Sequence, residues 1–317
     1  YEKAEELYND ILFACEKTIG VSHPDTLLTV NNLGLLYHNL GDYDKAKTFY
    51  RRSIEGHEVA LGKDHPMTLK SMGNLALVFN DIGEYEKAED LYNDVLFAYE
   101  KTLGVSHPDT LLTVNNLGSL YHALGDYDKA KTFYIRSIEG NEVTLGKDHP
   151  TTLKSMGNLA QLFNDIGEYD KAKELYNDVL SEYEKTLGVS HPDTLLAVNN
   201  LGLSYHNLGD YEKAESFYRR SIEGNEVALG KDHPMTLSSI TNLAQLFDDI
   251  EDYKNAIVQY KILIDLQNKQ LGPEALDTFV SINNLGLAYY NCGDYENAEP
   301  IFLEALAGYK KILEPSD

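Results

Sequence analysis

Hydrophobic side chains recur along this chain at steps of three and four residues, the spacing of one buried face of an α-helix. Within residues 23–64 a first stripe consists of Leu27, Val30, Leu33, Gly34, Tyr37 and Leu40. A second stripe consists of Ala46, Phe49, Tyr50, Ile54, His57 and Leu61. No segment combines two-residue alternation with an enrichment of β-branched residues. The pattern therefore predicts paired helices and no strand.

Polar residues, proline and glycine mark where these helices begin and end. The first helix is predicted to begin near Pro24, with Ser22 as its N-cap. Gly41 is predicted to stop this helix, and a second helix of about 19 residues, roughly 28 Å long, should begin near Tyr43 and end at Gly62.

The dipeptide His-Pro sets a strict period of 42 residues. It stands at 23–24, 65–66, 107–108, 149–150, 191–192 and 233–234, and Ala275-Leu276 takes its place in the last unit. A length of 317 residues would by itself favour two domains, but a fixed period indicates one linear array. We predict a single array over 1–317, with a half repeat at 1–22 and full repeats at 23–64, 65–106, 107–148, 149–190, 191–232, 233–274 and 275–316.

The repeats also alternate between two types. One type carries Asn-Asn-Leu-Gly, as at 31–34 and 115–118, and the other carries Gly-Asn-Leu-Ala, as at 73–76 and 157–160. Segments 23–106 and 107–190 differ at only 13 of 84 positions, counted directly from the sequence. The 84-residue pair is therefore interpreted as the unit of recent duplication.

The core positions resemble those of the tetratricopeptide repeat. Leu33-Gly34-x-x-Tyr37 followed by Ala46-x-x-x-Tyr50 is similar to the core pattern of that family, and the match recurs in all seven full units. The family's tryptophan is replaced, and the unit is longer than the 34-residue form. The 42-residue form with His-Pro-Asp-Thr resembles the repeats of kinesin light chains. The resemblance implies an all-α fold, a right-handed superhelical solenoid of helix-turn-helix repeats.

The resemblance also implies a concave groove lined by one face of the first helices. In the first full repeat this face would carry Leu28, Asn31, Asn32, Leu35, His38 and Asn39. In the family's peptide grooves an asparagine at one position holds the main chain of an extended peptide, since an amide both donates and accepts. Here that position holds Asn32, Asn74, Asn116, Asn158, Asn200, Asn242 and Asn284. Further candidate groove residues are His38, Asn80, His122, Asn164 and His206. In the alternative reading these amides only bridge neighbouring helices.

Charge narrows the class of partner. The chain has 27 basic and 51 acidic side chains, a net charge of −24, which disfavours nucleic acid and anionic membranes. No apolar run approaches the roughly 20 residues that span a bilayer. The groove face offers Lys70 and Lys154 against Asp81, Asp165 and further carboxylates, so a neutral or basic ligand is predicted. Kinesin light chains differ, because their grooves suit acidic cargo motifs.

Cysteine usage indicates the compartment. Cys15 and Cys292 lie near opposite ends of a linear array and are not expected to pair, and the chain has no Asn-x-Ser/Thr sequon. No signal peptide opens the chain, which begins at Tyr1 inside a repeat, as an excised fragment would. We therefore expect a cytoplasmic protein.

No motif for catalysis or metal binding is recognisable. Nucleotide-binding loops, a Gly-x-Ser-x-Gly elbow and a catalytic Cys/His pair are all missing from the sequence. Six of the ten histidines belong to the His-Pro turns and are predicted to sit at helix starts. His38, His122 and His206 fall on alternate repeats, on the order of 20 Å apart, too far to share one zinc ion. No enzyme activity, metal or cofactor is predicted.

These observations favour a non-enzymatic scaffold that binds a protein or an extended peptide in the groove. The alternative is a purely structural or self-associating array, such as the arm of a larger signalling or sensor protein. Neither end shows the polar face of a capping repeat, so weak head-to-tail association at high concentration is also expected.

Overall fold

The computed structural model describes residues 2–313, and every regular element in that range is an α-helix, with no strand. The predicted half repeat at 1–22 and the last repeat at 275–316 reach beyond this range at Tyr1 and at residues 314–316, which lie outside the described residues. Residue contacts divide the chain into two compact units, Tyr1–Leu162 and Phe163–Asp317. Each unit is described by itself.

The helices follow the predicted repeat. The first unit holds α1 (Glu2–Thr18), α2 (Pro24–Asn39), α3 (Tyr43–Leu61), α4 (Pro66–Asp81), α5 (Tyr85–Thr102), α6 (Pro108–Ala123), α7 (Tyr127–Thr144) and most of α8 (Pro150–Asp165). The second unit holds the end of α8 and α9 (Tyr169–Thr186), α10 (Pro192–Asn207), α11 (Tyr211–Ala228), α12 (Pro234–Asp249), α13 (Tyr253–Gln270), α14 (Leu276–Asn291) and α15 (Tyr295–Leu313). Even-numbered helices are the first helices of their repeats, and odd-numbered helices are the second helices.

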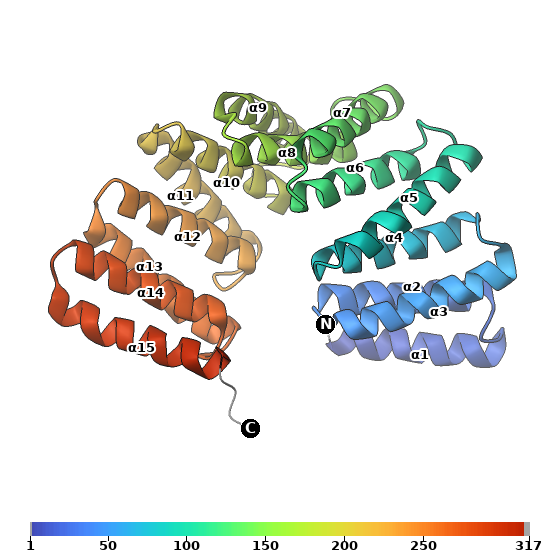
Figure 1. The fold of residues 1–317 in the computed structure, drawn as a ribbon, viewed down its shortest axis with the longest axis horizontal. Helices are drawn as coiled ribbons and strands as arrows, with labels where there is room; N and C mark the ends of the chain where they lie inside the picture. Colours follow the sequence, from blue (N-terminus) through green and yellow to red (C-terminus); the bar gives the residue numbers. More distant parts are fainter. Residues whose placement is uncertain (1, 314–317) are drawn as a thin grey trace. The chain divides into compact units, whose positions relative to one another are not determined.

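Consecutive helices pack on one another within each unit. A first helix such as α2 packs against the second helix that follows it, and that second helix packs against the first helix of the next repeat (Figure 1). The predicted all-α arrangement of helix-turn-helix repeats is confirmed.

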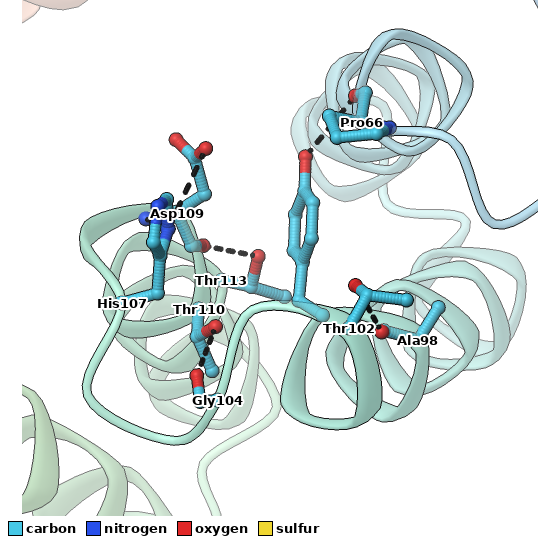
Figure 2. A network of polar contacts seen from close by, with 9 residues as sticks. Pro66, Ala98, Thr102, Gly104, His107, Asp109, Thr110 and Thr113 are labelled. Carbon is cyan, nitrogen blue, oxygen red and sulfur yellow. Dashed lines mark hydrogen bonds and ion pairs between the residues drawn. The ribbon is translucent and has the colours of Figure 1, made fainter.

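The histidine of each His-Pro pair caps the helix that follows. Between α5 and α6, the Nδ1 atom of His107 accepts a hydrogen bond from the N–H of Asp109 at 3.2 Å, and Thr110 Oγ1 donates to the carbonyl of Gly104 at 2.8 Å (Figure 2). The prediction that Ser22 caps α2 is wrong, because His23 is the N-cap. Proline at the first helical position holds the preceding residue in the extended backbone of an N-cap.

Small residues let the two helices of a repeat approach closely. A Cβ atom on Gly118 of α6 would lie 2.7 Å from the ring of Tyr134 on α7. Tyr134 is almost fully buried, and so is Ala130 one turn earlier. The buried tyrosine recurs in the other second helices of the described residues from α3 to α13, so this aromatic stripe is core packing.

Two details of the predicted buried stripes are wrong. Leu40 is 40% exposed because it is the C-cap residue, beyond the last turn of α2, and Leu36 is buried in its place. Ser53 on α3 is fully buried although the hydrophobic pattern leaves it out. The polar side chains buried between the helices are described next.

Candidate peptide-binding face

One side of each first helix remains open to solvent. In α2 this side carries Leu28, Asn32 and Leu35, which stand at i, i+4 and i+7 and therefore share a face. Leu28 and Leu35 are 37% and 44% exposed, and Asn32 is half-buried. We call these three positions, with their equivalents in the other first helices, the Asn face. Asn31, also predicted for this face, is buried, and that prediction is wrong.

Exposed leucines on the Asn face occur on alternate helices. In the first unit Leu112 of α6 is 45% exposed, whereas the equivalent residues of α4 and α8 are the exposed Lys70 and Lys154. In the second unit the same position holds exposed Leu196, Ser238 and Val280. The Asn face therefore differs between the two repeat types.

Three of the seven recurrent asparagines bridge neighbouring first helices. In each case the Nδ2 atom donates to the Oδ1 atom of an asparagine 43 residues earlier. The bonds run from Asn74 to Asn31, from Asn158 to Asn115 and from Asn242 to Asn199, at 3.1–3.2 Å. For these three residues the structure supports the alternative reading of the sequence, in which the amides hold adjacent helices together.

The other asparagines of this register are placed differently. Asn32, Asn116 and Asn284 are half-buried, and within residues 2–313 their side chains make no hydrogen bond. Asn200 is intermediate, because its Oδ1 atom accepts a hydrogen bond from Asn199 Nδ2 at 3.2 Å. Asn116 shares its helix with Leu112, so a partner-free amide and an exposed leucine occur on the same helix of the first unit. The position 43 residues before Asn32 would precede Tyr1, so this sequence holds no counterpart residue for Asn32.

A buried polar cluster lies behind each bridge. In the first unit Ser137 Oγ donates to the carbonyl of Leu111 at 3.1 Å, lies 3.1 Å from Ser155 Oγ and accepts from Asn141 Nδ2 at 3.3 Å. The same arrangement surrounds Ser53, and in the second unit Ser221. These polar side chains hold consecutive repeats together and were not predicted from the sequence.

The intervening second helix α5 carries apolar side chains at the positions of this polar cluster. On α5, Val95 and Tyr99 take the positions of Ser137 and Asn141 and pack with Leu69 and Met72 of α4. The sequence signal that could have found the polar clusters is this alternation of serine with valine every 42 residues.

The cluster around Ser53 contains a buried histidine. His57 is almost fully buried, its Nδ1 atom lies 3.2 Å from Ser53 Oγ, and its Nε2 atom has no partner among the described residues. Burial lowers the pKa of His57 below its ordinary value, since a charged ring would lose its hydration. The nearby ring of His65 acts in the same direction.

Acid should therefore destabilise the chain through His57. Because the pKa of His57 is lower in the folded than in the unfolded state, where it is about 6.5, the unfolded state binds the proton first as the pH falls. The free energy of unfolding should decline as the pH drops below about 6.5 and level off below the folded pKa. Urea unfolding at about pH 7.5 and about pH 5.5 measures this decline.

The matched control is His57→Asn, since asparagine already occupies the equivalent place at Asn141 and Asn225. The variant keeps every other titrating group, so the difference between the two chains isolates His57. An identical pH dependence in both proteins would show that His57 carries no proton-linked stability.

The remaining predicted site residues are engaged with neighbouring repeats or helices. His38 Nε2 lies 2.6 Å from Asp81 Oδ2, and in the second unit His206 Nε2 lies 2.8 Å from Asp249 Oδ2. The ring of His122 packs on Tyr127 with the centroids 5.9 Å apart.

The two asparagines that alternate with these histidines are further from solvent. Asn164 is buried and accepts from Ser204 Oγ at 3.0 Å. Asn80 Oδ1 is buried without a partner in the described part of the chain. These two side chains belong to packing between helices rather than to the open part of the Asn face.

The described residues form neither a metal-binding cluster nor a membrane-spanning helix. Among residues 2–313, no three histidine, cysteine, aspartate or glutamate side chains gather where they could hold a metal ion. None of the helices in that range is long and apolar enough to span a membrane. The Asn face itself offers amides, leucines and a few charged side chains.

Comparison with known proteins places the chain among helical repeat proteins. The sequence profiles of the tetratricopeptide repeat match residues 1–58, 27–101, 109–185, 166–226, 193–269 and 278–317. A search of curated proteins gave no match.

Solved structures with a similar fold are numerous. Nearly identical tetratricopeptide-like repeats of a putative kinesin light chain from Podosopora anserina are 26% identical, with a TM-score of 0.55, over 65% of this chain and 97% of that one. The apo quorum sensor NprR from B. thuringiensis is 14% identical, with a TM-score of 0.74, over 97% of this chain and 83% of that one. A signal transduction ATPase from Pyrococcus horikoshii with a tetratricopeptide repeat sensor is 13% identical, with a TM-score of 0.69, over 98% of this chain and 45% of that one. The last two likenesses concern the fold alone.

Proposed function

Because the chain belongs to the tetratricopeptide repeat family, we propose that it is a non-enzymatic scaffold whose Asn face binds a protein segment in extended form. The observation that carries this proposal is the pairing of exposed leucines with partner-free amides on the same helices. On α6, Leu112 is 45% exposed, and Asn116 stands one turn further along the same face. A side-chain amide can hydrogen-bond to both the N–H and C=O groups of a peptide main chain. Burial of a leucine against the ligand contributes about 25 cal/mol of binding free energy per Å² of apolar surface.

The alternative function is a purely structural array. The observation that favours it is the bridging of Asn74, Asn158 and Asn242, whose amides already serve the fold. That observation does not extend to Asn116, whose counterpart 43 residues earlier is Gly73 and which has no such partner within the described range. The structural function therefore depends on the bridging asparagines, and the binding function depends on the asparagines without such a partner.

Three finer properties belong to the same proposal: a neutral or basic ligand, a cytoplasmic location, and weak head-to-tail association of copies. Two of the carboxylates on which the preference for a basic ligand rests, Asp81 and Asp249, are paired with histidines. Lys70 and Lys154 are exposed on the Asn face and favour a neutral ligand over a basic one. Self-association is supported by exposed apolar side chains on the terminal helices, such as Leu7 and Leu303.

Substitution on the Asn face tests the binding function. Peptides are selected from a random displayed library against the wild-type chain, and their affinities are then measured for the double variant Leu28→Asp, Leu112→Asp. We expect at least about tenfold weaker binding, which corresponds to about 1.4 kcal/mol, because an apolar ligand would strip water from the new carboxylates.

The control carries the same substitutions on the outer helices, as Val59→Asp with Val143→Asp. These valines are 87% and 85% exposed on α3 and α7, so the change in charge is the same and the fold is spared. Binding by this variant should match the wild type. If no peptide is selected, or if both double variants lose affinity equally, the Asn face is not the binding surface and the structural alternative stands.

A further inference from the structure

Asn116 differs in its partners from Asn74 and Asn158, and the difference follows from one position in the preceding repeat. Asn74 and Asn158 bond to Asn31 and Asn115, which stand 43 residues earlier. The residue 43 positions before Asn116 is Gly73, which has no side chain to accept a hydrogen bond. The amide of Asn116 is left without a partner in the described chain because the repeats alternate between Asn-Asn and Gly-Asn.

We propose that only the asparagines of alternate first helices, Asn32 and Asn116 in the first unit, hold the main chain of a bound peptide, while Asn74 and Asn158 are structural. This inference rests on the proposed function and names the ligand's pattern. The same helices carry the exposed Leu28 and Leu112, whereas α4 and α8 carry Lys70 and Lys154. Main-chain contacts and apolar contacts therefore coincide on every second helix.

The spacing of these helices sets the spacing of the ligand's side chains. First helices α2, α4 and α6 lie in sequence within the first unit (Figure 1). With packed helices about 8–10 Å apart, α2 and α6 are separated by on the order of 20 Å. An extended peptide advances about 3.3 Å per residue, so the two points of contact are about six residues apart along it. The ligand class is an extended segment with apolar side chains at that interval.

A peptide series measures the spacing. The probes are fluorescein-labelled peptides of glycine, serine and threonine that carry two leucines at separations from about two to about nine residues. Fluorescence anisotropy with the full chain should give the tightest binding at about five to six residues. Equal binding at every separation, or no binding by any member of the series, would overturn the proposed pattern.

A matched pair of variants tests the division of labour. Asn116→Ala should weaken binding of the best peptide by about three- to tenfold and leave thermal unfolding unchanged, because it removes a ligand contact only. Asn158→Ala should lower the unfolding midpoint, because it leaves Asn115 Oδ1 without its donor, and should spare the affinity of the folded chain. Equal losses of affinity in the two variants would contradict the alternation.

A third variant gives the amide of Asn116 a hydrogen-bond partner without replacing Asn116. A Cβ atom on Gly73 meets nothing within 4 Å, so Gly73→Asn has room to supply the acceptor that Asn31 supplies to Asn74. This variant should bind the peptide more weakly, whereas Gly73→Ala, which has no acceptor, should bind like the wild type. If display selection yields binders that depend on Leu28 and Leu112 but Gly73→Asn has no effect, the division of labour fails while the proposed function survives. If no such binders exist, the proposed function itself fails.

Discussion

Replacement of Gly140 by alanine is expected to lower the free energy of unfolding by about 1–3 kcal/mol. A Cβ atom at this position of α7 would lie 2.4 Å from Leu111 Cδ2 and 3.2 Å from its Cγ. Leu111 is almost fully buried on α6, so its side chain has little space into which to move. Urea unfolding followed by circular dichroism measures the loss.

The opposite sign is expected for Gly73→Ala in α4. Nothing lies within 4 Å of the Cβ atom there, and alanine is favoured over glycine inside a helix, so the free energy of unfolding should rise by about 0.5–1 kcal/mol. The two variants make the same chemical change within one unit. If both stabilise the chain, Leu111 adapts and the close approach of α6 to α7 is not needed for stability.

The close approach at Gly140 has a specific consequence for the buried polar cluster. It brings Ser137, one turn earlier on α7, within 3.1 Å of the carbonyl of Leu111 on α6. The same three residue types recur as Gly56, Ser53 and Leu27, and in the second unit as Gly224, Ser221 and Leu195. In α5, where valine replaces the serine, Ala98 replaces the glycine and packs in the apolar cluster with Leu69. In α3, α7 and α11 the glycine gives the serine the short distance that its hydrogen bond requires, whereas in α15 Gly308 lies close to Phe279 with Ala305 in the place of the serine.

The helices themselves were predictable from the sequence because their boundaries depend on local residues. Pro24 begins α2 and Tyr43 begins α3, as predicted, since proline at the first turn and glycine after the last turn act within a few residues. The sequence predicts Ser22 as the N-cap because serine is among the residues preferred at that position. The structure has His23 there instead, because the fold of the turn brings its ring within hydrogen-bond distance of the N–H of Asp25.

The Asn face could be predicted from the sequence only in part. Leu28, Asn32 and Leu35 lie on one open side, as helical spacing requires, but Asn31 turned out to be buried. The Oδ1 atom of Asn31 accepts hydrogen bonds from Ser71 and Asn74 of α4, which lie 40 and 43 residues further along the chain. Hydrophobic periodicity treats a polar residue as solvent-facing, so it cannot identify an asparagine whose partners come from the next repeat.

The substitution Ser137→Val tests how much the buried polar cluster contributes to stability. Valine fits this position in principle, because Val95 and Val179 occupy it in the intervening repeats. The substitution nevertheless leaves the Nδ2 atom of Asn141 buried without its acceptor and Ser155 without its partner across the junction. An unsatisfied buried amide costs about 1–3 kcal/mol, and the free energy of unfolding should fall by about that amount. A Ser137→Val chain as stable as the wild type would show that the cluster contributes nothing.

The companion variant converts the α7 side of the cluster to its apolar form. Adding Gly140→Ala and Asn141→Tyr to Ser137→Val reproduces the Val95, Ala98 and Tyr99 of α5, whose tyrosine hydroxyl donates to the carbonyl of Pro66. The triple variant should be more stable than Ser137→Val alone, although Gly140→Ala is destabilising by itself, because the three residues are in mutual contact and their effects do not add. A triple variant that loses the sum of the separate losses would mean that the polar and apolar junctions are not interchangeable units, and that each repeat type is fitted to its own place in the chain.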